Sequence, residues 1–470
     1  MANFLLKEAA SHAPGMAVDY ENLMSPVLRG SSTAKRPDLE AGDGRESQGA
    51  SLWILLAVSM PRMTVNMAWA AQWAALGPYL STMLPNYAVQ LTSVTGPVIG
   101  IIFGPVIGVL SDRSTSRFGR RRPILVGMGV LSIICWILMG YTSEIGEALG
   151  DVGSGAAGEK TDRKWTAIFT LIFYLWMDIT VTCSQTPTML MVADFAGDRQ
   201  TLGAALGLGW ATMGAIIPAV YIQIWGAAYL TLHWFMGLLC VVMFISVAVC
   251  RLRVSTCESV RDSFVTIFNG VRTMPPMLTV YAAIMFFVLD SSLASKCTAE
   301  VPTTQTRATR ARPSNHGVSK ASGLGDLLFN IVGYVYSWLL PFLVRQFGAR
   351  WVLSGSMLAQ ALLMAMAFCS NVGFDIFIIA ILSVAQGSAF ALTVPTIIHV
   401  FGDRSDVDIG MYVGALNSAN CFGQLLNFAI GTAVVQTSLG YKLPVFLGGA
   451  MSFLGFLVGA FLFKVKMHSM

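Results

Sequence analysis

Long apolar stretches alternate with short polar segments along most of this chain. A helix that crosses a membrane needs about 20 mostly apolar residues. By that measure we expect two groups of membrane-spanning helices, one in residues 51–250 and one in 277–463. The individual spans are expected near 53–81, 88–110, 123–141, 165–192, 202–226, 229–250, 277–290, 325–344, 351–370, 374–398, 409–435 and 441–463. The pattern therefore predicts an all-α membrane protein with twelve transmembrane helices.

The segments outside these spans are polar. Residues 1–50 mix charged side chains with Gly, Ser and Pro, which is typical of a disordered tail. Residues 251–276 form a basic linker, and 464–470 form a short second tail. Arginine and lysine are concentrated in this linker, in the second tail and in the loop 111–122. The positive-inside rule therefore predicts that both termini are cytoplasmic. The acid-rich loop 142–164 is then expected outside.

Composition supports a membrane protein and excludes other classes. Of the 470 residues, 55% are hydrophobic and 12% are charged, whereas soluble domains carry about 25% charged residues. The formal charge of +5 lies mainly in loops, and no basic stripe interleaved with aromatic residues indicates nucleic-acid binding. We find no catalytic triad, phosphate-binding loop or metal-ligand spacing. We therefore expect no enzyme activity, no metal and no resident cofactor.

A short sequence repeat relates the two groups of spans. The string Phe-Gly-x-Arg occurs around Gly119 and Gly348, each time after the second span of its group. The string Gly-Asp-Arg occurs at Gly197 and Gly402, each time after the fourth span. Each of these glycines is expected in a turn. The repeat predicts two pseudo-symmetric six-helix halves.

Glycine recurs at every fourth position of the second span, at Gly96, Gly100, Gly104 and Gly108. Such a face lets the backbone of another helix approach closely. The pattern fits a static packing seam and also a sliding contact between moving helices, and the sequence does not decide between them.

Asp178 lies in the middle of the fourth span, and the nearest charges in sequence are Lys164 and Asp194. A buried carboxylate without a charged partner is unfavourable and tends to bind a proton. We therefore interpret Asp178 as a proton-coupling residue. The alternative is a structural carboxylate that is hydrogen-bonded across helices. Thr182 and Gln185 follow on the same helical face.

The first span also has one polar and aromatic face, which begins at Arg62. Tryptophan can stack on the C–H face of a sugar, and Asn or Gln can bond its hydroxyl groups. The candidate substrate-binding residues are Asn66, Trp69, Gln72, Trp73 and, from the fourth span, Gln185. The alternative is ordinary aromatic packing, with Arg62 reaching to the membrane interface.

The loop after the second span reads Ser-Asp-Arg-Ser-Thr-Ser-Arg-Phe-Gly-Arg-Arg-Arg-Pro over residues 111–123. It resembles the signature loop of the major facilitator superfamily. The resemblance implies a cytoplasmic gate formed by Asp112, Arg113, Arg117, Gly119, Arg120, Arg121 and Arg122.

Three further strings resemble one branch, the plant sucrose–proton symporters and their animal sugar-transporter relatives. They are Trp-Ala-Ala-Gln at 69–72, Leu-Gly-Pro-Tyr at 76–79, and the segment 176–187 that contains Asp178. The resemblance implies a symporter of sucrose or another mono- or disaccharide, with the proton as coupling ion. We expect a monomer in the lipid bilayer of the plasma membrane or, alternatively, of an acidic organelle.

Residues 291–320 depart from the branch pattern because they are polar and basic. The apolar run 277–290 would give only about 21 Å of helix, against a hydrocarbon core of about 30 Å. We therefore expect span 7 to be incomplete, ending or becoming irregular near Asp290, with 295–318 poorly ordered. A compensated pair of frameshifts and a genuine divergent loop both explain the change. Two functional alternatives stay open: a transport-deficient or sensor homologue, and a carrier for a non-sugar solute.

Overall fold

The structure is a computed structural model of the whole chain. The residues that it describes are 49–72, 80, 94–114, 119–153, 162–225, 272, 274–299, 315–369, 372–402, 408–434 and 442–467. Side chains are not described at 222–223, 225, 288–299, 315–324, 326, 372 and 431–434. Residues 1–48 of the expected tail 1–50, span 6 and most of the linker 251–276 lie outside the described residues.

The described elements are helices. Those before the linker are α2 (Leu52–Ser59), α3 (Pro61–Ala71), α6 (Thr95–Arg113), α7 (Arg122–Gly140), α8 (Thr142–Ala148), α9 (Lys164–Ala196) and α10 (Gln200–Trp225). Those after it are α13 (Pro276–Ala299), α15 (Asn315–Gln360), α16 (Leu363–Met366), α17 (Val372–Phe401), α18 (Ile409–Val434) and α19 (Lys442–Phe461). An isolated bridge joins Val152 and Asp162 in the loop after α8.

Long apolar segments form these helices because only a helix satisfies every backbone group inside a bilayer. Among the described residues, seven helical stretches are long and apolar enough to cross a membrane. The expected span 1 is divided into α2 and α3, with Pro61 in the first turn of α3. Spans 8 and 9 run together in α15 and are separated by Gly348. The all-helical membrane architecture predicted from the sequence is confirmed.

The four glycines of the sequence repeat all have positive φ. The angles are 107° at Gly119, 54° at Gly197, 80° at Gly348 and 62° at Gly402. Side chains other than hydrogen are disfavoured in this region, so glycine is required where the helix reverses. The predicted turns are therefore confirmed in both halves.

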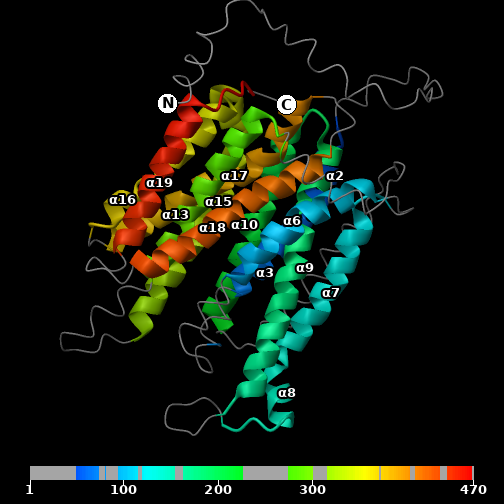
Figure 1. Cartoon of the computed structure of the whole chain (residues 1–470), viewed down its shortest axis with the longest axis vertical. Coiled ribbons are helices and arrows are strands. Elements are labelled where there is room, and N and C mark those ends of the chain that lie inside the picture. Colours follow the sequence, from blue (N-terminus) through cyan, green and yellow to red (C-terminus); the bar gives the residue numbers. More distant parts are fainter. Residues whose placement is uncertain are drawn as a thin grey trace, which may run out of the picture. The chain divides into compact units, whose positions relative to one another are not determined.

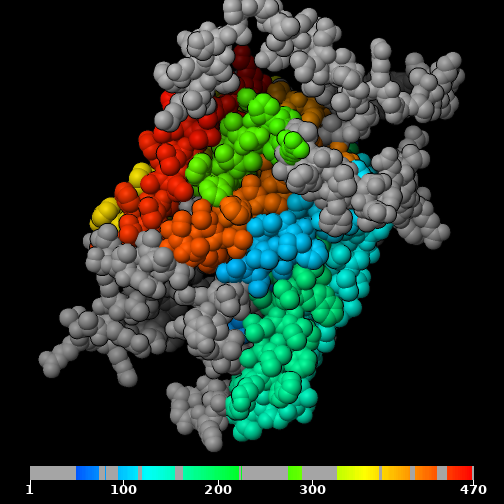
Figure 2. Space-filling view, in the orientation of Figure 1, coloured from blue at the N-terminus to red at the C-terminus, as the bar shows by residue number. Residues whose placement is uncertain are grey.

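Helices of the two halves meet along two seams. The pair α6 and α18 forms one seam and the pair α10 and α15 forms the other. Figures 1 and 2 show α6 and α18 side by side, although they are separated by about 300 residues in sequence. The fold thus brings together segments that only the tertiary structure could pair.

One end of the bundle carries the arginine-rich turns and is called the basic end below. It contains the turns at Gly119, Gly197 and Gly348, and also the C-terminal segment 463–467. The N–H of Ala349 donates to the carbonyl oxygen of Met467 over 2.8 Å. The short helix α8 and the bridge between Val152 and Asp162 belong to the opposite end. The basic end is the one that the positive-inside rule assigns to the cytoplasm.

The C-terminal segment is docked on the bundle. Phe463, Val465 and Met467 are buried, whereas Lys464 and Lys466 between them are exposed. This alternation is that of an extended strand with one apolar face. The predicted tail 464–470 is therefore not free over its first residues.

Span 7 corrects one expectation. Helix α13 continues to Ala299, so the predicted end or irregularity near Asp290 is wrong. Residues 291–299 contain no Gly or Pro and include good helix formers such as Ala and Leu, so helical hydrogen bonding continues through a polar sequence. The apolar part is still short, because only Pro276–Phe287 qualifies as an apolar helix.

The rest of the unusual stretch is divided. Residues 315–318, expected to be poorly ordered, form the first turn of α15. Residues 300–314 lie outside the described residues.

Candidate functional site

Asp178 lies in the middle of α9 and is 5% exposed. Thr95 of α6 donates a hydrogen bond of 3.1 Å to its Oδ2 atom, and the side chains of Tyr174 and Gln72 are the other polar groups near the carboxylate. All three partners are uncharged. Among the described residues no cation forms an ion pair with Asp178. Asp178 thus lacks a charged partner, as expected of a proton-coupling residue, and is also hydrogen-bonded across helices, as expected of a structural carboxylate.

One of the predicted sugar-binding residues, Gln72, lies near this carboxylate. Gln72 is buried at the end of α3, but its side-chain amide nitrogen forms no hydrogen bond among the described residues. Trp69, one turn earlier, packs against the buried cluster that contains Tyr174 and Met177. Gly96 of α6 faces the carboxylate, since a methyl group added there would be in ordinary contact with Asp178 Oδ2 at 3.6 Å.

The other candidates are not joined to Asp178. Asn66 and Gln185 are partly buried, and neither side chain forms a described hydrogen bond with this carboxylate. Trp73 lies outside the described residues. Sugar binding by all five residues and proton coupling by Asp178 remain predictions.

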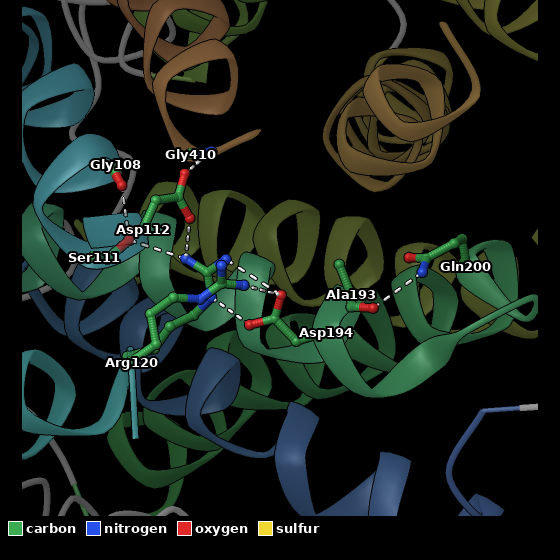
Figure 3. A network of polar contacts seen from close by, with 9 residues as sticks. Gly108, Ser111, Asp112, Arg120, Ala193, Asp194, Gln200 and Gly410 are labelled. Atoms are coloured by element: carbon green, nitrogen blue, oxygen red, sulfur yellow. Dashed lines mark hydrogen bonds and ion pairs between the residues drawn. The ribbon is translucent and has the colours of Figure 1, made fainter. Parts of the chain in front are cut away.

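A cluster of opposite charges occupies the basic end. We call Asp112, Arg120, Arg121 and Asp194 the Arg121 cluster. Arg121 is 1% exposed and bridges two carboxylates, with Nη1 at 2.8 Å from Asp112 Oδ1 and Nε at 2.6 Å from Asp194 Oδ2. Arg120 adds a bond of 2.8 Å to Asp194. Figure 3 shows Asp112 and Asp194 on opposite sides of the guanidinium groups.

The charges of this cluster compensate one another. Burial lowers the pKa of the Arg121 guanidinium, but the carboxylates of Asp194 and Asp112 outweigh burial, so its pKa is raised above the ordinary value. Ser111 accepts a further hydrogen bond from Arg121 over 3.0 Å. The loop after α6 is therefore held firmly against α9.

Two contacts join this region of the N-terminal half to the C-terminal half. The backbone N–H of Gly410, in the first turn of α18, donates to Asp112 Oδ2 over 2.6 Å (Figure 3). Arg113 Nη2 lies 3.1 Å from Asp408 Oδ2, just before the same helix. An acidic group at a helix N-terminus is stabilised by the free N–H groups and the helix dipole. The basic end is therefore closed by contacts between α6 and α18.

The predicted glycine ridge forms the seam below these charges. A methyl group at Gly108 would overlap the carbonyl oxygen of Gly410, and one at Gly104 would lie 3.5 Å from the carbonyl oxygen of Gly414. Gly100 faces Cys421 of α18. The ridge thus packs between the halves at three of its four positions, whereas Gly96 faces Asp178.

Sequence reasoning missed several partners in this region. Asp194 was not assigned to the gate, and neither Asp408 nor Thr95 was singled out. The only signal for Asp408 is its position just before the apolar run of span 11, where Asp is a favoured helix-capping residue. Of the predicted gate residues, Arg122 is buried and Arg117 lies outside the described residues.

Two protein-family descriptions match this chain. Residues 57–294 match the family described as MFS/sugar transport protein, and residues 314–469 match the Major Facilitator Superfamily. The first match alone covers half of the chain. The chain belongs to the major facilitator superfamily. Both matches are families of transporters and not of enzymes, in agreement with the sequence prediction.

Curated relatives of this major facilitator protein include plant sucrose transport proteins. One from Arabidopsis thaliana is 31% identical over 182 residues, which are 38% of this chain and 30% of the relative. One from Oryza sativa subsp. indica is 30% identical over 178 residues, which are 37% of this chain and 35% of the relative. The matched region thus spans about a third of the length of each relative.

Solved structures show the same fold. A proton:xylose symporter bound to 6-bromo-6-deoxy-D-glucose has a TM-score of 0.62 at 12% identity, covering 88% of this chain and 97% of that chain. The fucose:proton symporter of E. coli has a TM-score of 0.62 at 11% identity, covering 87% and 98%. The twelve-helix major facilitator fold is therefore confirmed.

Proposed function

We propose that this chain is a proton-coupled sugar symporter that works by alternating access between its two halves. The observation that carries the proposal is the buried carboxylate of Asp178, which has only uncharged partners among the described residues. An acidic group in this environment is poised to exchange a proton, because the membrane interior disfavours its charged form.

Proton binding at Asp178 would be felt first by α6. The ionised carboxylate accepts a hydrogen bond from Thr95 of α6. A protonated carboxyl has one acceptor site fewer and becomes a donor, so this bond rearranges. Gln72 lies near the carboxylate at the end of the helix that carries Asn66 and Trp69, so a change at Asp178 would also affect the proposed sugar site.

The cycle also requires the basic end to open. The bonds from Gly410 to Asp112 and from Arg113 to Asp408 join the halves there, and they must break for the solute to leave toward that side. We assign this side to the cytoplasm because of its arginine-rich turns. The structure would then be a state of the cycle that is closed toward the cytoplasm.

The comparisons support sugar as the solute. The matched family is described as sugar transport, the named relatives are sucrose transport proteins, and two similar folds are sugar–proton symporters. We propose a monomer in the plasma membrane, with sucrose or another mono- or disaccharide as substrate.

Uptake of labelled sucrose, maltose and glucose into transport-null cells, with and without a pH gradient, tests this function. Accumulation of one sugar that depends on the gradient is expected. Asp178→Asn should abolish gradient-driven accumulation while sugar exchange persists, because a fixed neutral amide cannot cycle a proton. Asp162→Asn, the same change at an exposed carboxylate, is the matched control. Gradient-driven accumulation by Asp178→Asn would make Asp178 structural.

A transport-deficient homologue is the second candidate, and the polar second half of α13 favours it. Asp290 and Lys296 lie in this helix, although charges are rare in spans. Replacing residues 291–318 by the equivalent segment of an intact relative separates the two candidates. Uptake that appears only in the chimera would show that the natural chain is defective, and equal uptake would show that it is competent.

A further inference from the structure

Arg62 lies within the helical bundle, in the first turn of α3. Its side chain is only 8% exposed, which rules out the interpretation that it reaches to the membrane interface. It packs against α10, where a methyl group added at Gly207 would lie 2.7 Å from Arg62 Nη1. Glycine at position 207 therefore leaves the space that the buried guanidinium occupies.

Arg62 lines a small cavity between the two halves. Met189, Val192 and Ala204 line it from the N-terminal half, and Ala391 and Val394 of α17 line it from the C-terminal half. The cavity has a volume of about 10 Å³, which is room for about one water molecule. The cavity lies between Arg62 and the basic end, because α9 and α17 both end there and α10 begins there.

The charge of Arg62 is not compensated. No acidic side chain lines the cavity, and Arg62 has neither a hydrogen bond nor an ion pair among the described residues. The polar lining residue Gln200 donates its amide N–H groups to the carbonyl oxygens of Ala193 and Gly197 (Figure 3), and its amide oxygen accepts no hydrogen bond from Arg62 among the described residues. An uncompensated cation that is largely removed from water is unfavourable.

This unfavourable charge acts against the closed arrangement of the halves. The cavity is this narrow only while α17 lies against α9 and α10, and separating these helices would widen it and let more water reach Arg62. Hydration of the guanidinium would then lower the free energy of the open arrangement. The contacts of Asp112 and Arg113 with α18 act in the opposite direction, since they hold the same end closed.

We propose that Arg62 is a residue of the transport cycle that promotes opening of the basic end. It does so through its buried charge and not through a contact with the sugar or the proton site. The proposal rests on the alternating-access part of the proposed function. It assigns to span 1 a second role, beside the predicted sugar contacts of Asn66 and Trp69.

A thiol placed in the cavity measures this opening directly. Ala391→Cys introduces it at a position that is buried when the basic end is closed. The rate of its reaction with a membrane-impermeant maleimide is measured on purified protein, and the same chain without Ala391→Cys corrects for natural cysteines. Arg62→Met should slow labelling about tenfold or more, whereas Arg62→Lys, which keeps the charge, should stay within about twofold of the parent.

Thermal stability separates this role from a packing role. Arg62→Met should melt at the same or a higher temperature than the parent, because the closed state loses an uncompensated charge. Arg62→Gln provides a second uncharged variant if Arg62→Met fails to fold. Unchanged or faster labelling in both uncharged variants would overturn the proposal, as would equally slow labelling in Arg62→Lys. Labelling needs neither sugar nor a proton gradient, so its failure is distinct from a failure of the uptake experiment.

Discussion

The turns at Gly119 and Gly348 occupy equivalent places in the two halves but are held in different ways. In the N-terminal half, Arg121 lies between the carboxylates of Asp112 and Asp194. Its counterpart Arg350 instead donates to the carbonyl oxygen of Ala460 and lies 5.2 Å from the ring centre of Trp351. The backbone turn is repeated, whereas the ionic cluster is not.

Residues at equal distances from the repeated glycines show how the charges differ between the two halves. Pro341 stands where the other half has Asp112, and His399 stands where it has Asp194. Ser383 stands at the position of Asp178 and is buried like it. The two halves therefore share a framework of turns, but the proposed gate and proton site lie in one half. The C-terminal half contributes helix ends and small residues against which these charges close.

Removing the central arginine of each turn gives the largest expected contrast. Arg121→Met leaves the buried carboxylates of Asp112 and Asp194 without their main cation, which should cost about 3–5 kcal/mol. Arg350→Met removes a bond to a neutral carbonyl and should cost about 1–3 kcal/mol. Chemical or thermal unfolding of purified variants measures both. Equal losses would mean that the ionic cluster adds nothing to the repeated turn.

The seam between the halves can be tested by adding one methyl group. In Gly414→Ala the new group would lie 2.5 Å from Pro105 Cα, and overpacking of this kind should destabilise the closed arrangement by about 1–3 kcal/mol. Gly127→Ala is the matched control, since nothing lies within 4 Å of its added methyl group. Of these two variants, only Gly414→Ala is expected to speed the labelling of the thiol that Ala391→Cys places in the Arg62 cavity. If both variants behave like the parent, the seam is not tightly packed in solution.

The opposite end offers a smaller contrast, because the sequence of the N-terminal half alone has the long loop 142–164. There Asp151 accepts hydrogen bonds from the backbone N–H groups of Trp165 and Thr166 at 3.1 and 2.7 Å, and so acts as a cap for α9. Burial raises the pKa of the Asp151 carboxyl, but the bonds from Thr166 and Trp165 outweigh it and lower the pKa overall.

Asp151→Ala should therefore destabilise the protein by about 0.5–2 kcal/mol at neutral pH. A lowered pKa stabilises the fold above the ordinary aspartate value of about 3.9, and this contribution is lost as the pH falls through the lowered value. Melting temperatures of the parent and variant should differ at pH 6 and converge at low pH. A difference that stays constant with pH would show that the carboxylate charge is not involved.

The smallest expected effect concerns the ion pair between the halves. Arg113 and Asp408 are 15% and 25% exposed, so their pairing should contribute about 0.2–1 kcal/mol and weaken with salt. A double-mutant cycle of Arg113→Ala and Asp408→Ala at low and high salt measures it. A larger coupling energy that is insensitive to salt would show that this ion pair, and not the glycine seam, contributes most to holding the basic end closed.

The sequence alone determined the features that depend on local patterns. Apolar runs of membrane-spanning length established the helices, because in lipid the backbone must satisfy its own hydrogen bonds. Repeated glycines at 119, 197, 348 and 402 predicted the turns, because positive φ excludes most other residues. The ridge at Gly100, Gly104 and Gly108 predicted a close helix contact without naming the partner. The same local reasoning failed at α13, where it treated polarity as a break in the helix although the backbone continues to Ala299.

The tertiary structure decided which residues meet. It joined Asp112 to Gly410 and Arg113 to Asp408 across almost 300 residues, and it brought Thr95 to Asp178. It also placed Arg62 at a small cavity between the halves, where the sequence had suggested the membrane surface as one alternative. Helical periodicity specifies which side chains share a face, but the choice of the facing helix depends on packing of the whole bundle. Partners of buried charges therefore could not be read from the sequence.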